Sequence, residues 1–525
     1  MDDAAHPLLK QRLPARLMPL ATAMGLRPFY GDIHNHCAIS YGHGSLDSAL
    51  ARARQQLDFV SVTGHAYWPD MPVNEPSVAH IVAFHVEGFA RLQQNWRPHY
   101  AKLAEAHEPG RFTVFPGYEI HSSQHGDYTI VYRDLDQDEL IEAESPAELH
   151  RRLEARYPGR AFAFPHHIGY REGARGINWR SFDENLSPVL EIVSMHGLSE
   201  TSLGDRPFLH SMGPADGHST VEHGLAHGNV FGFLGNTDHH SAYPGSYGHG
   251  RSAVYAAENA STAIWDALHA RRTVALTGDC AHLFASIDGL PFGSRVAEGP
   301  DKVLCIEAVA GSFIDHIDII RNGRLVERIS PEITPHAIDP DGDRFETIFN
   351  LELGWGARGS SHDWTGSVRF DGGEILAVEP RLRGPEIVSP LEGEGTAPPL
   401  PRIGGDVQRL DFALRAEANP NNSTAATQAI AARVRLSPDS IIHADFDGHR
   451  LDIPAARLLD GALSGNLGPI DSPAYRFHPL PRAADWQWTG EVTLGAVAAG
   501  ETVYVRLRQK NGQWAWASPF FFTSP

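Results

Sequence analysis

The sequence predicts an α/β protein with a seven-stranded, TIM-like βα barrel in residues 1–282 and a β-rich, sandwich-like region in residues 283–525. In the first part, short apolar runs alternate with helical patterns, which is typical of parallel strands covered by helices. In the second part, strand-like runs follow one another with turn signals and little helix, which is typical of antiparallel sandwiches. Histidine is also unevenly distributed along the chain, because 24 of the 30 histidines lie before residue 283.

The seven candidate strands of the first part are short, apolar and rich in β-branched or aromatic residues. Ser45 and Ser145 are suitable N-caps for two of the helices between them. The strands begin near residues 29, 57, 111, 161, 189, 229 and 273, and the helices cover 45–56, 145–158 and 259–272. Two further segments interrupt this alternation: a helical insertion at about 70–110 and an antiparallel ribbon at 126–133.

The β-rich region carries two Asn-Gly pairs, at 322–323 and 511–512, which predict hairpins. Two stretches, 390–405 and 417–428, have the composition of loops or linkers, so a division into two sub-domains near 390–428 is open. Three roles are open for the region: covering the barrel, shaping a pocket, or forming a homo-oligomer.

The composition narrows the class of partner. The formal net charge of −20 disfavours nucleic acid and anionic membranes, where affinity comes largely from Lys and Arg on phosphates. The chain has three cysteines and no CxxC, which fits a reducing compartment. It has no apolar run of about 18 residues and no signal-peptide pattern at its start. We therefore expect a cytoplasmic protein with a small-molecule substrate and without nucleic-acid or membrane partners.

Histidine and carboxylate residues fall at the ends of six candidate strands. In a parallel barrel these ends meet at one rim, where the active sites of such barrels lie. The residues are Asp32, His34 and His36 after the first strand, His65 after the second, Glu119 and His121 after the third, His166 and His167 after the fourth, His196 after the fifth, and Asp238, His239 and His240 after the sixth.

The spacing at this rim points to metal ions. His34 and His36 are separated by two positions, as are Asp238 and His240, so each pair lies on one side of its strand. The rim supplies more nitrogen and oxygen ligands than one ion needs, which implies two or three divalent ions. Imidazole and carboxylate without thiolate suit Zn, Mn or Fe, and the sequence does not choose among them.

In order, "GDIHNHCAIS", "SVTGHA", "GYEI", "FPHHIG", "MHG" and "NTDHH" resemble the motifs of the PHP (polymerase and histidinol phosphatase) superfamily. Within it, the chain is similar to large metallohydrolases with a β-rich extension, the DUF3604-like and carbaryl-hydrolase-like branch. The resemblance covers about residues 30–283 and implies a distorted seven-stranded barrel with a trinuclear site. The second motif departs from the family pattern, since Gly64-His65 stands where Asp-His is usual.

The resemblance also implies a ligand set for each of three ions. A carboxylate such as Glu119 can bridge two of them, and His167 is an alternative to His166. The first ion would take His34, His36, Glu119 and Asp238, the second would share Glu119 and add His166 and His196, and the third would take His43, His65 and His240.

Arginines near the rim are candidates for binding the substrate. Arg171 and Arg175 follow the fourth strand and Arg251 follows the sixth, and a guanidinium group fits phosphate or carboxylate oxygens. His121 is a further candidate for substrate contact. Solvated loop charge is the alternative interpretation for Arg171 and Arg175.

These residues predict a metal-dependent hydrolase. The ions would lower the pKa of bound water from about 15.7 toward 7, and the resulting hydroxide would attack a small phosphate ester. Asp238 would orient or deprotonate the nucleophile, Glu119 would bridge the ions, and a histidine outside the ligand sets, such as His239, would protonate the leaving group. Two alternatives stay open: hydrolysis of a carbamate, carboxylic ester or lactone at the same site, and a non-catalytic, metal-containing binding module.

Overall fold

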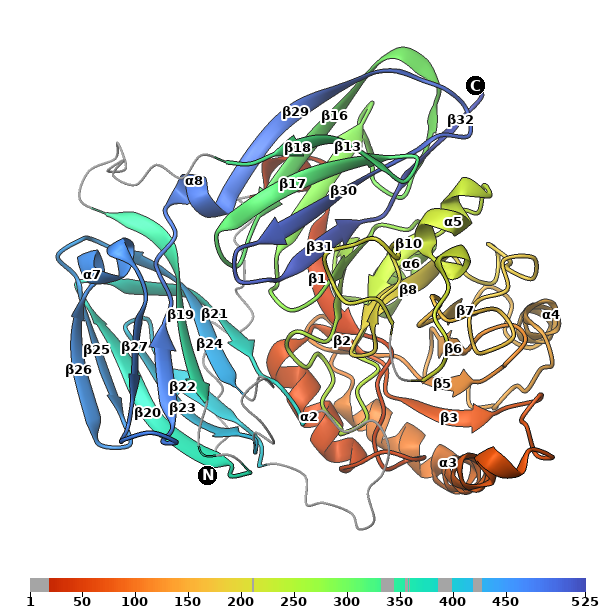
Figure 1. Cartoon of the computed structure of the whole chain (residues 1–525), viewed down its shortest axis with the longest axis horizontal. Coiled ribbons are helices and arrows are strands. Elements are labelled where there is room, and N and C mark those ends of the chain that lie inside the picture. Colours follow the sequence, from red (N-terminus) through yellow and green to blue (C-terminus); the bar gives the residue numbers. More distant parts are fainter. Residues whose placement is uncertain are drawn as a thin grey trace.

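The computed structural model describes residues 18–209, 212–331, 344–354, 357, 359–385, 399–418 and 427–525. Figure 1 shows three bodies: an α/β part, a β part joined to it, and a separate β-sandwich beside both. The helices are α1 (Pro19–Ala23), α2 (Leu46–Gln56), α3 (Ala79–Ala106), α4 (Pro146–Arg156), α5 (Val221–Ala226), α6 (Ser261–His269), α7 (Ala455–Asp460) and α8 (Ala483–Trp486), with 3₁₀ turns η2 (Pro76–Val78) and η3 (Gly217–Ser219).

The α/β part contains twelve strands among the described residues. They are β1 (Arg27–Asp32), β2 (Phe59–Val60), β3 (Thr63–Tyr67), β4 (Thr113–Val114), β5 (Gly117–Ile120), β6 (Tyr128–Tyr132), β7 (Ala161–Pro165), β8 (Val189–Ser194), β9 (Gly197–Leu198), β10 (Gly232–Gly235), β11 (Arg251–Ala256) and β12 (Thr273–Leu276).

The other two bodies consist mainly of strands. The β part contains β13 (His282–Ile287), β14 (Leu290–Pro291), β15 (Arg295–Ala297), β16 (Gly299–Val309), β17 (Ile314–Arg321), β18 (Arg324–Ile329), β29 (Gln487–Val497), β30 (Thr502–Gln509), β31 (Trp514–Ala517) and β32 (Phe520–Thr523). The sandwich contains β19 (Phe345–Gly354), β20 (His362–Asp371), β21 (Glu374–Arg381), β22 (Arg402–Gly405), β23 (Arg409–Ala416), β24 (Gln428–Leu436), β25 (Ile441–Phe446), β26 (His449–Pro454), β27 (Leu463–Asn466) and β28 (Ala474–Phe477).

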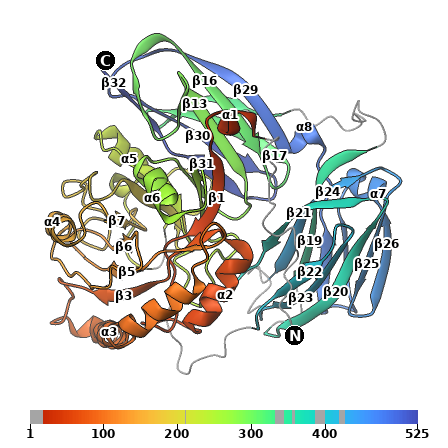
Figure 2. The ribbon, with the colours of Figure 1, turned by 180° about the vertical axis from the view of Figure 1, so that it is seen from behind.

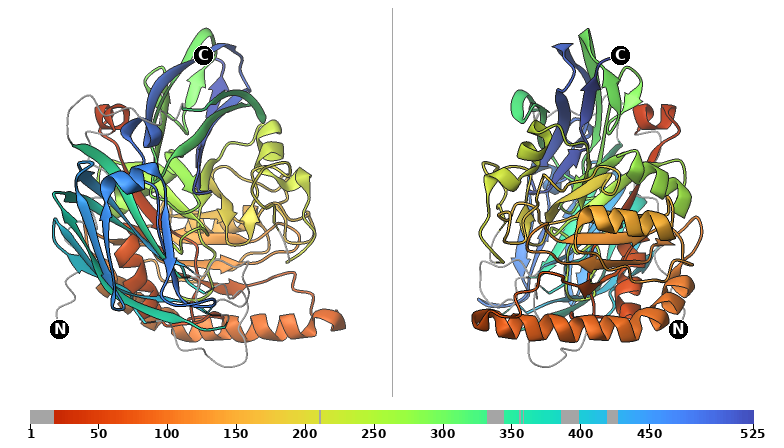
Figure 3. Two further views of the ribbon diagram at one scale, coloured as in Figure 1. Left: turned by 60° about the vertical axis from the view of Figure 1, so that its left-hand side comes forward. Right: turned by 90° about the vertical axis from the view of Figure 1, so that its right-hand side faces the viewer.

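The predicted helices form where the sequence placed them, and local signals explain their starts. The Ser45 hydroxyl accepts a hydrogen bond from the backbone N–H of Ser48, and Ser145 caps α4 in the same way through Glu148. In α2 the side chains of Leu46, Ala49, Leu50 and Ala53 are buried at helical spacing, so one face of the helix packs on the core. The predicted insertion contains α3, which runs along one edge of the molecule (Figure 3).

The strands around the rim differ from the expected closed barrel. Two predicted strands are each interrupted, giving β2 and β3 from the second, and β4 and β5 from the third. Pro116 lies at the second interruption, where it cannot donate a backbone hydrogen bond. The pieces still pair in parallel, β2 with β4 and β3 with β5. The ribbon at 126–133 is confirmed as β6, which lies antiparallel between β5 and β7.

The hydrogen-bonded strands of the described residues divide among several sheets and form no continuous barrel. One sheet contains β3-β5-β6-β7, a second contains β10-β8-β9, and β1, β2 and β4 belong to a third. In the third sheet, β11 lies antiparallel between β1 and β12, a position where the sequence predicted no strand. The observed architecture is therefore strand-rich α/β with parallel pairs at the rim.

The third sheet continues into the β part. Its eleven strands include β12 paired with β31, so residues from both sides of the predicted boundary at 282/283 share one sheet. The sheet β14-β13-β16-β29 lies beside it, and their apolar faces share a core. The boundary stays a prediction. Seen from behind, α1 lies beside β13 and β16 (Figure 2).

The sandwich consists of two five-stranded sheets, β21-β24-β19-β28-β27 and β22-β23-β20-β25-β26. Trp364, Phe446 and Phe477 are buried between them. Most of the loops proposed as a division near 390–428 lies outside the described residues, and that division stays a prediction. The strand β20, which precedes this range, pairs with β25, which follows it.

The hairpin predicted at Asn322-Gly323 joins β17 to β18, and both turn residues have positive φ, as a type I′ turn requires. Asn511-Gly512 lies between β30 and β31, which also pair. Among the described residues, no helix has the length and apolar character needed to cross a membrane.

A buried histidine on α3 gives a pH-dependent stability. His99 is 2% exposed, and neither ring nitrogen has a hydrogen-bond partner among the described residues. Burial lowers the pKa of His99 to about 3. The unfolded chain binds this proton below about pH 6.5, whereas the folded chain does not, so the contribution of His99 to stability is complete above about pH 6.5 and is lost as the pH falls toward 3.

Between about pH 7 and pH 5, the unmodified protein should lose about 2 kcal/mol more unfolding free energy than the variant His99→Leu. Urea unfolding at the two pH values measures this difference. The matched control is His80→Leu, because His80 lies exposed on the same helix. An equal pH dependence in the two variants would contradict the assignment.

Candidate metal centre

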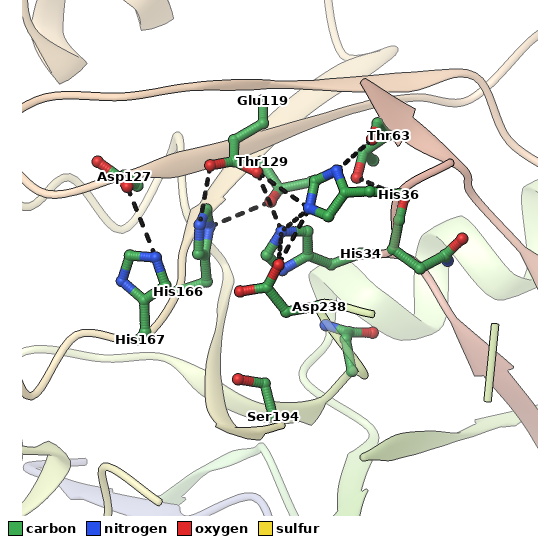
Figure 4. Close-up of polar contacts among 12 residues, drawn as sticks. His34, His36, Thr63, Glu119, Asp127, Thr129, His166, His167, Ser194 and Asp238 are labelled. Atoms are coloured by element: carbon green, nitrogen blue, oxygen red, sulfur yellow. Dashed lines mark hydrogen bonds and ion pairs between the residues drawn. The ribbon is translucent and has the colours of Figure 1, made fainter. Parts of the chain in front are cut away.

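The strand ends bring histidine and carboxylate side chains from six places in the sequence to one buried centre. Figure 4 shows the part of this centre around His34, Glu119 and Asp238. The residues that follow strands lie after β1, β7, β8 and β10, while His65 and Glu119 lie within β3 and β5. Because β1 pairs in parallel with β2, and β3 with β5, these side chains approach the same rim. The residues brought together are His34, His36, His65, Glu119, His121, Asp127, His166, His167, His196, Asp238 and His240.

Two carboxylates lie at the middle of the centre. The His34 and His36 rings lie between Glu119 and Asp238 in Figure 4. Oε2 of Glu119 lies 3.2 Å from Nε2 of His34 and 3.3 Å from Nε2 of His36. Oδ1 of Asp238 lies 3.0 Å from the same atom of His36. The other carboxylate oxygens face further histidines, since Oε1 of Glu119 is 3.3 Å from His166 and Oδ2 of Asp238 is 3.1 Å from His196.

Five of these histidines are anchored through Nδ1. A carbonyl or carboxylate oxygen at Nδ1, as at His34, His36 and His240, favours the tautomer with its proton there, which leaves a lone pair on Nε2 for a cation. The contacts of Nδ1 are Glu191 Oε2 at 2.8 Å for His34, the Thr63 carbonyl at 2.6 Å for His36, Ser40 Oγ at 3.1 Å for His65, Thr129 Oγ1 at 3.2 Å for His166 and the Asp238 carbonyl at 2.8 Å for His240.

Burial and contacts between the carboxylates and the histidines set the pKa values of four side chains at the centre. Burial raises the pKa of Glu119, but the neighbouring His166, His121 and His65 outweigh it and hold this pKa well below its usual range. Asp238 is likewise buried, and its neighbours keep its pKa low. Burial, reinforced by the nearby histidines, lowers the pKa of His65 and of His240 well below the usual range. Ionised carboxylates and neutral imidazoles are the protonation states that bind divalent cations.

The side chains form groups that partly follow the expected ligand sets. His34, His36, Glu119 and Asp238 form one group, as expected for the first ion. In the set expected for the second ion, His166 faces Glu119, whereas His196 groups with Asp238 and His240. The groups fit cations for three reasons: each offers at least three nitrogen or oxygen donors, no cysteine of the described residues takes part, and Nε2 of His166, although 3.3 Å from Glu119, is buried without a hydrogen-bond partner among these residues. The number of ions stays a prediction.

The set expected for the third ion is met in part. His65 and His240 lie together with His36, while His43 belongs to none of the groups found among the described residues. The backbone N–H of His43 donates to the His240 carbonyl at 2.7 Å, and its Nε2 is buried with no hydrogen-bond partner in the part of the chain that the structure describes. His167 lies 3.5 Å from Asp127 instead of facing Glu119, which favours His166 as the ligand.

The position of Gly64 explains the departure in the second motif. A Cβ atom on this residue would lie 2.4 Å from Cδ1 of Leu92, which belongs to α3. The inserted helix therefore occupies the space that an aspartate side chain would need. Asp238 and His167 have positive φ values of 50° and 31°, which are uncommon outside glycine and occur preferentially at functional sites.

Three predicted site residues lie away from the centre. His239 is fully buried, and its ring packs near those of Tyr243 and His249. Arg251 is fully buried and donates to the Gly245 carbonyl and to Gln56, so its guanidinium supports the fold. Arg171 is exposed on its loop.

Arg175 and His121 lie at the edge of the centre. Arg175 donates two hydrogen bonds to Oδ2 of Asp127, at 2.5 and 3.0 Å. His121 lies between Asp127 and Glu119, at 3.0 and 3.2 Å, and its Nε2 is 3.2 Å from the Tyr41 hydroxyl. The positive charge of Arg175 is therefore compensated by a carboxylate within the protein.

Two carboxylates of the centre were not among the candidates from the sequence. Glu191 lies inside β8 and bonds Nδ1 of His34, and Asp127 directly precedes β6. A charged residue within the apolar run "VLEIVS" is a signal that points to Glu191. Asp127 has no comparable signal, since an aspartate after a glycine is also typical of a turn.

Comparison with known proteins gives only distant likenesses. No protein-family model matches the chain, and no curated protein matches it. Among solved structures, a two-domain protein from Bacteroides vulgatus ATCC 8482 containing a predicted PHP-like metal-dependent phosphoesterase is similar over 86% of this chain and 98% of its own, with 11% identity and a TM-score of 0.31. PsfC from Pseudomonas syringae PB-5123 is similar over 43% of this chain and 82% of its own, with 17% identity and a TM-score of 0.28. Both TM-scores are low.

Proposed function

We propose that the protein is a divalent-metal-dependent hydrolase of small phosphate esters, with a distorted PHP-type barrel of the DUF3604-like branch. The observation that carries this proposal is the donor arrangement: histidines held at Nδ1 direct Nε2 toward the ionised carboxylates of Glu119 and Asp238. A set of structural hydrogen bonds would not need so many imidazole nitrogens around two buried carboxylates. The proposal includes a cytoplasmic setting and Zn, Mn or Fe as the bound ions, two or three in number.

The side chains have distinct roles in this proposal. Bound divalent cations supply Lewis acidity toward the substrate and lower the pKa of water at the centre. Glu119 faces two groups of histidines with its two oxygens, so it would hold one cation with each oxygen. Asp238 is placed to accept a proton at Oδ2, beside His196. Burial and the charge of Glu119 raise the pKa of Tyr41, so its hydroxyl keeps its proton and orients His121.

A second candidate function keeps the centre and changes the bond that is hydrolysed. Arg171 is exposed, Arg251 supports the fold, and Asp127 compensates Arg175. Two of the three arginines expected to bind a phosphoryl group are therefore engaged within the protein and the third is exposed on its loop, which favours a carbamate, carboxylic ester or lactone as the electrophile.

Metal removal is the test of the proposed function. We expect chelation to abolish hydrolysis of p-nitrophenyl phosphate, and reloading with Zn²⁺, Mn²⁺ or Fe²⁺ to restore it together with the bound metal measured by elemental analysis. Faster hydrolysis of p-nitrophenyl acetate by the same reloaded protein would select the second candidate. Full metal occupancy without turnover on a broad panel of esters would contradict both and would favour the binding module.

A further inference from the structure

The helix α3 approaches the metal centre at two glycines. Gly88 belongs to α3, and a Cβ atom on it would lie 2.4 Å from Cδ1 of Tyr41. At the second glycine, the side chain of Leu92 in α3 lies against Gly64, the residue before His65. A side chain at Gly88 would have to displace the Tyr41 ring, so a glycine is needed here for close approach. The backbone of α3 therefore lies directly against the ring of Tyr41.

The ring of Tyr41 lies in turn on the ring of His65. Their centroids are 3.6 Å apart, and the two ring planes differ by 15°. The His65 ring stacks on that of His36 as well, at 3.9 Å and 18°. Tyr41 is 7% exposed and also contacts Phe84 of α3, with 4.3 Å between the ring centroids. Because a closely packed ring cannot tilt without displacing its neighbours, the orientation of the His65 ring depends on α3 through Tyr41.

The polar contact of His65 at Nδ1 defines its ring less sharply than the contacts of neighbouring histidines do. Ser40 Oγ lies 3.1 Å from Nδ1 and also accepts a hydrogen bond from the backbone N–H of His65. A hydroxyl can donate to a ring nitrogen or accept from it, whereas the oxygens at Nδ1 of His34 and His36 belong to a carboxylate and a carbonyl. Stacking on Tyr41 is therefore a principal restraint on the plane of the His65 ring.

We propose that Tyr41 is a positioning residue of the metal centre, which fixes the His65 imidazole for cation binding and makes α3 part of the site. The inference rests on the proposed function, because it requires that the group His36, His65 and His240 holds a cation. An imidazole that is already held in one orientation loses less conformational freedom when a cation binds. The stack therefore raises the affinity of this group, as supporting contacts of metal ligands do.

The test is cobalt binding to chelated protein. Titration calorimetry resolves the binding steps, and the visible absorption of Co²⁺ reports the ligands at each step. The variant His65→Ala identifies the step that depends on His65, because that step is lost. We expect Tyr41→Leu to weaken the same step by about tenfold to a hundredfold and to leave the other steps unchanged. Tyr41→Phe keeps the stacked ring and loses only the hydroxyl, so it should retain the affinity of the unmodified protein.

Gly88→Ala perturbs the stack from the side of α3. It displaces the Tyr41 ring and should weaken the same cobalt-binding step, so it gives the comparison even if Tyr41→Leu does not fold. The matched control is Leu103→Ala, which removes a buried side chain of α3 roughly four helical turns beyond Gly88. This control should lower the unfolding temperature without changing any cobalt-binding step.

Three results would overturn the inference. The first is an unchanged cobalt affinity in folded Tyr41→Leu or Gly88→Ala. The second is an equal loss in Tyr41→Phe, which would assign the effect to the hydroxyl, and the third is an equal loss in Leu103→Ala, which would assign it to the stability of α3. All three leave cation binding at the centre in place, whereas an unmodified protein that binds no cobalt would contradict the proposed function as well.

Discussion

Replacing Glu119 with glutamine is expected to lower kcat/KM by about a thousandfold or more and to reduce the bound divalent metal. The side chain is 2% exposed and contacts His34, His36 and His166 through its two oxygens. Glutamine has nearly the same shape, but it is neutral and offers one oxygen. The variant therefore removes the charge that attracts cations and the second donor that allows bridging.

Glu191→Gln is the graded comparison for this prediction. Glu191 contacts only Nδ1 of His34 within the centre and also accepts a hydrogen bond from Asn236. Loss of such a supporting carboxylate typically costs about 10- to 100-fold in metal affinity or activity, so this variant should fall between Glu119→Gln and the unmodified protein.

Elemental analysis and ester hydrolysis measure both effects, and thermal unfolding confirms that the variants are folded. His80→Ala is the control, since this histidine is exposed on α3 and belongs to none of the groups at the centre. Full metal content with full activity in Glu119→Gln would refute the assignment of the centre.

Where local chemistry and strand direction act together, the sequence indicates which side chains lie near one another in the folded chain. His34 and His36 share a strand end two residues apart, and parallel pairing brings that end beside His65 and Glu119. The helix caps at Ser45 and Ser145 depend on interactions within four residues, so they too are visible in the sequence.

Pairings between distant segments are the part that the sequence does not reveal. The run "RSAVYA" is suitable for a strand, but nothing local indicates that β11 inserts antiparallel between β1 and β12. Pairing of β31 with β12 joins segments more than two hundred residues apart. For the same reason, the sequence does not show that the Arg251 guanidinium faces Gly245 and Gln56 in the folded chain.

Replacing Arg381 with methionine is expected to lower the free energy of unfolding by about 3 to 5 kcal/mol. Arg381 is 1% exposed at the end of β21 and contacts Asp279 and Glu379, each at 3.3 Å. It also donates to the Gly311 carbonyl at 2.9 Å. Methionine fills similar space but removes this cation from the buried Asp279 and the partly buried Glu379, at the place where all three bodies meet.

Asp279 makes the network a connection between the bodies. Its carboxylate accepts hydrogen bonds from the Tyr247 hydroxyl and the Asn511 amide, both at 2.7 Å. Tyr247 belongs to the metal-centre loop and Asn511 to the β30–β31 hairpin, while Arg381 belongs to the sandwich. Loss of the arginine should therefore loosen the sandwich from the other two bodies before either unfolds.

Urea unfolding followed by tryptophan fluorescence measures the effect, and limited proteolysis reports the loosening. The control Arg369→Met removes an exposed arginine whose contact with Asp371 is 3.8 Å, and it should change stability by less than about 0.5 kcal/mol. The double variant Arg381→Met with Asp279→Asn should be more stable than the sum of the single changes, because one uncompensated charge is removed with its partner. Strict additivity would show that Arg381 contributes by packing alone.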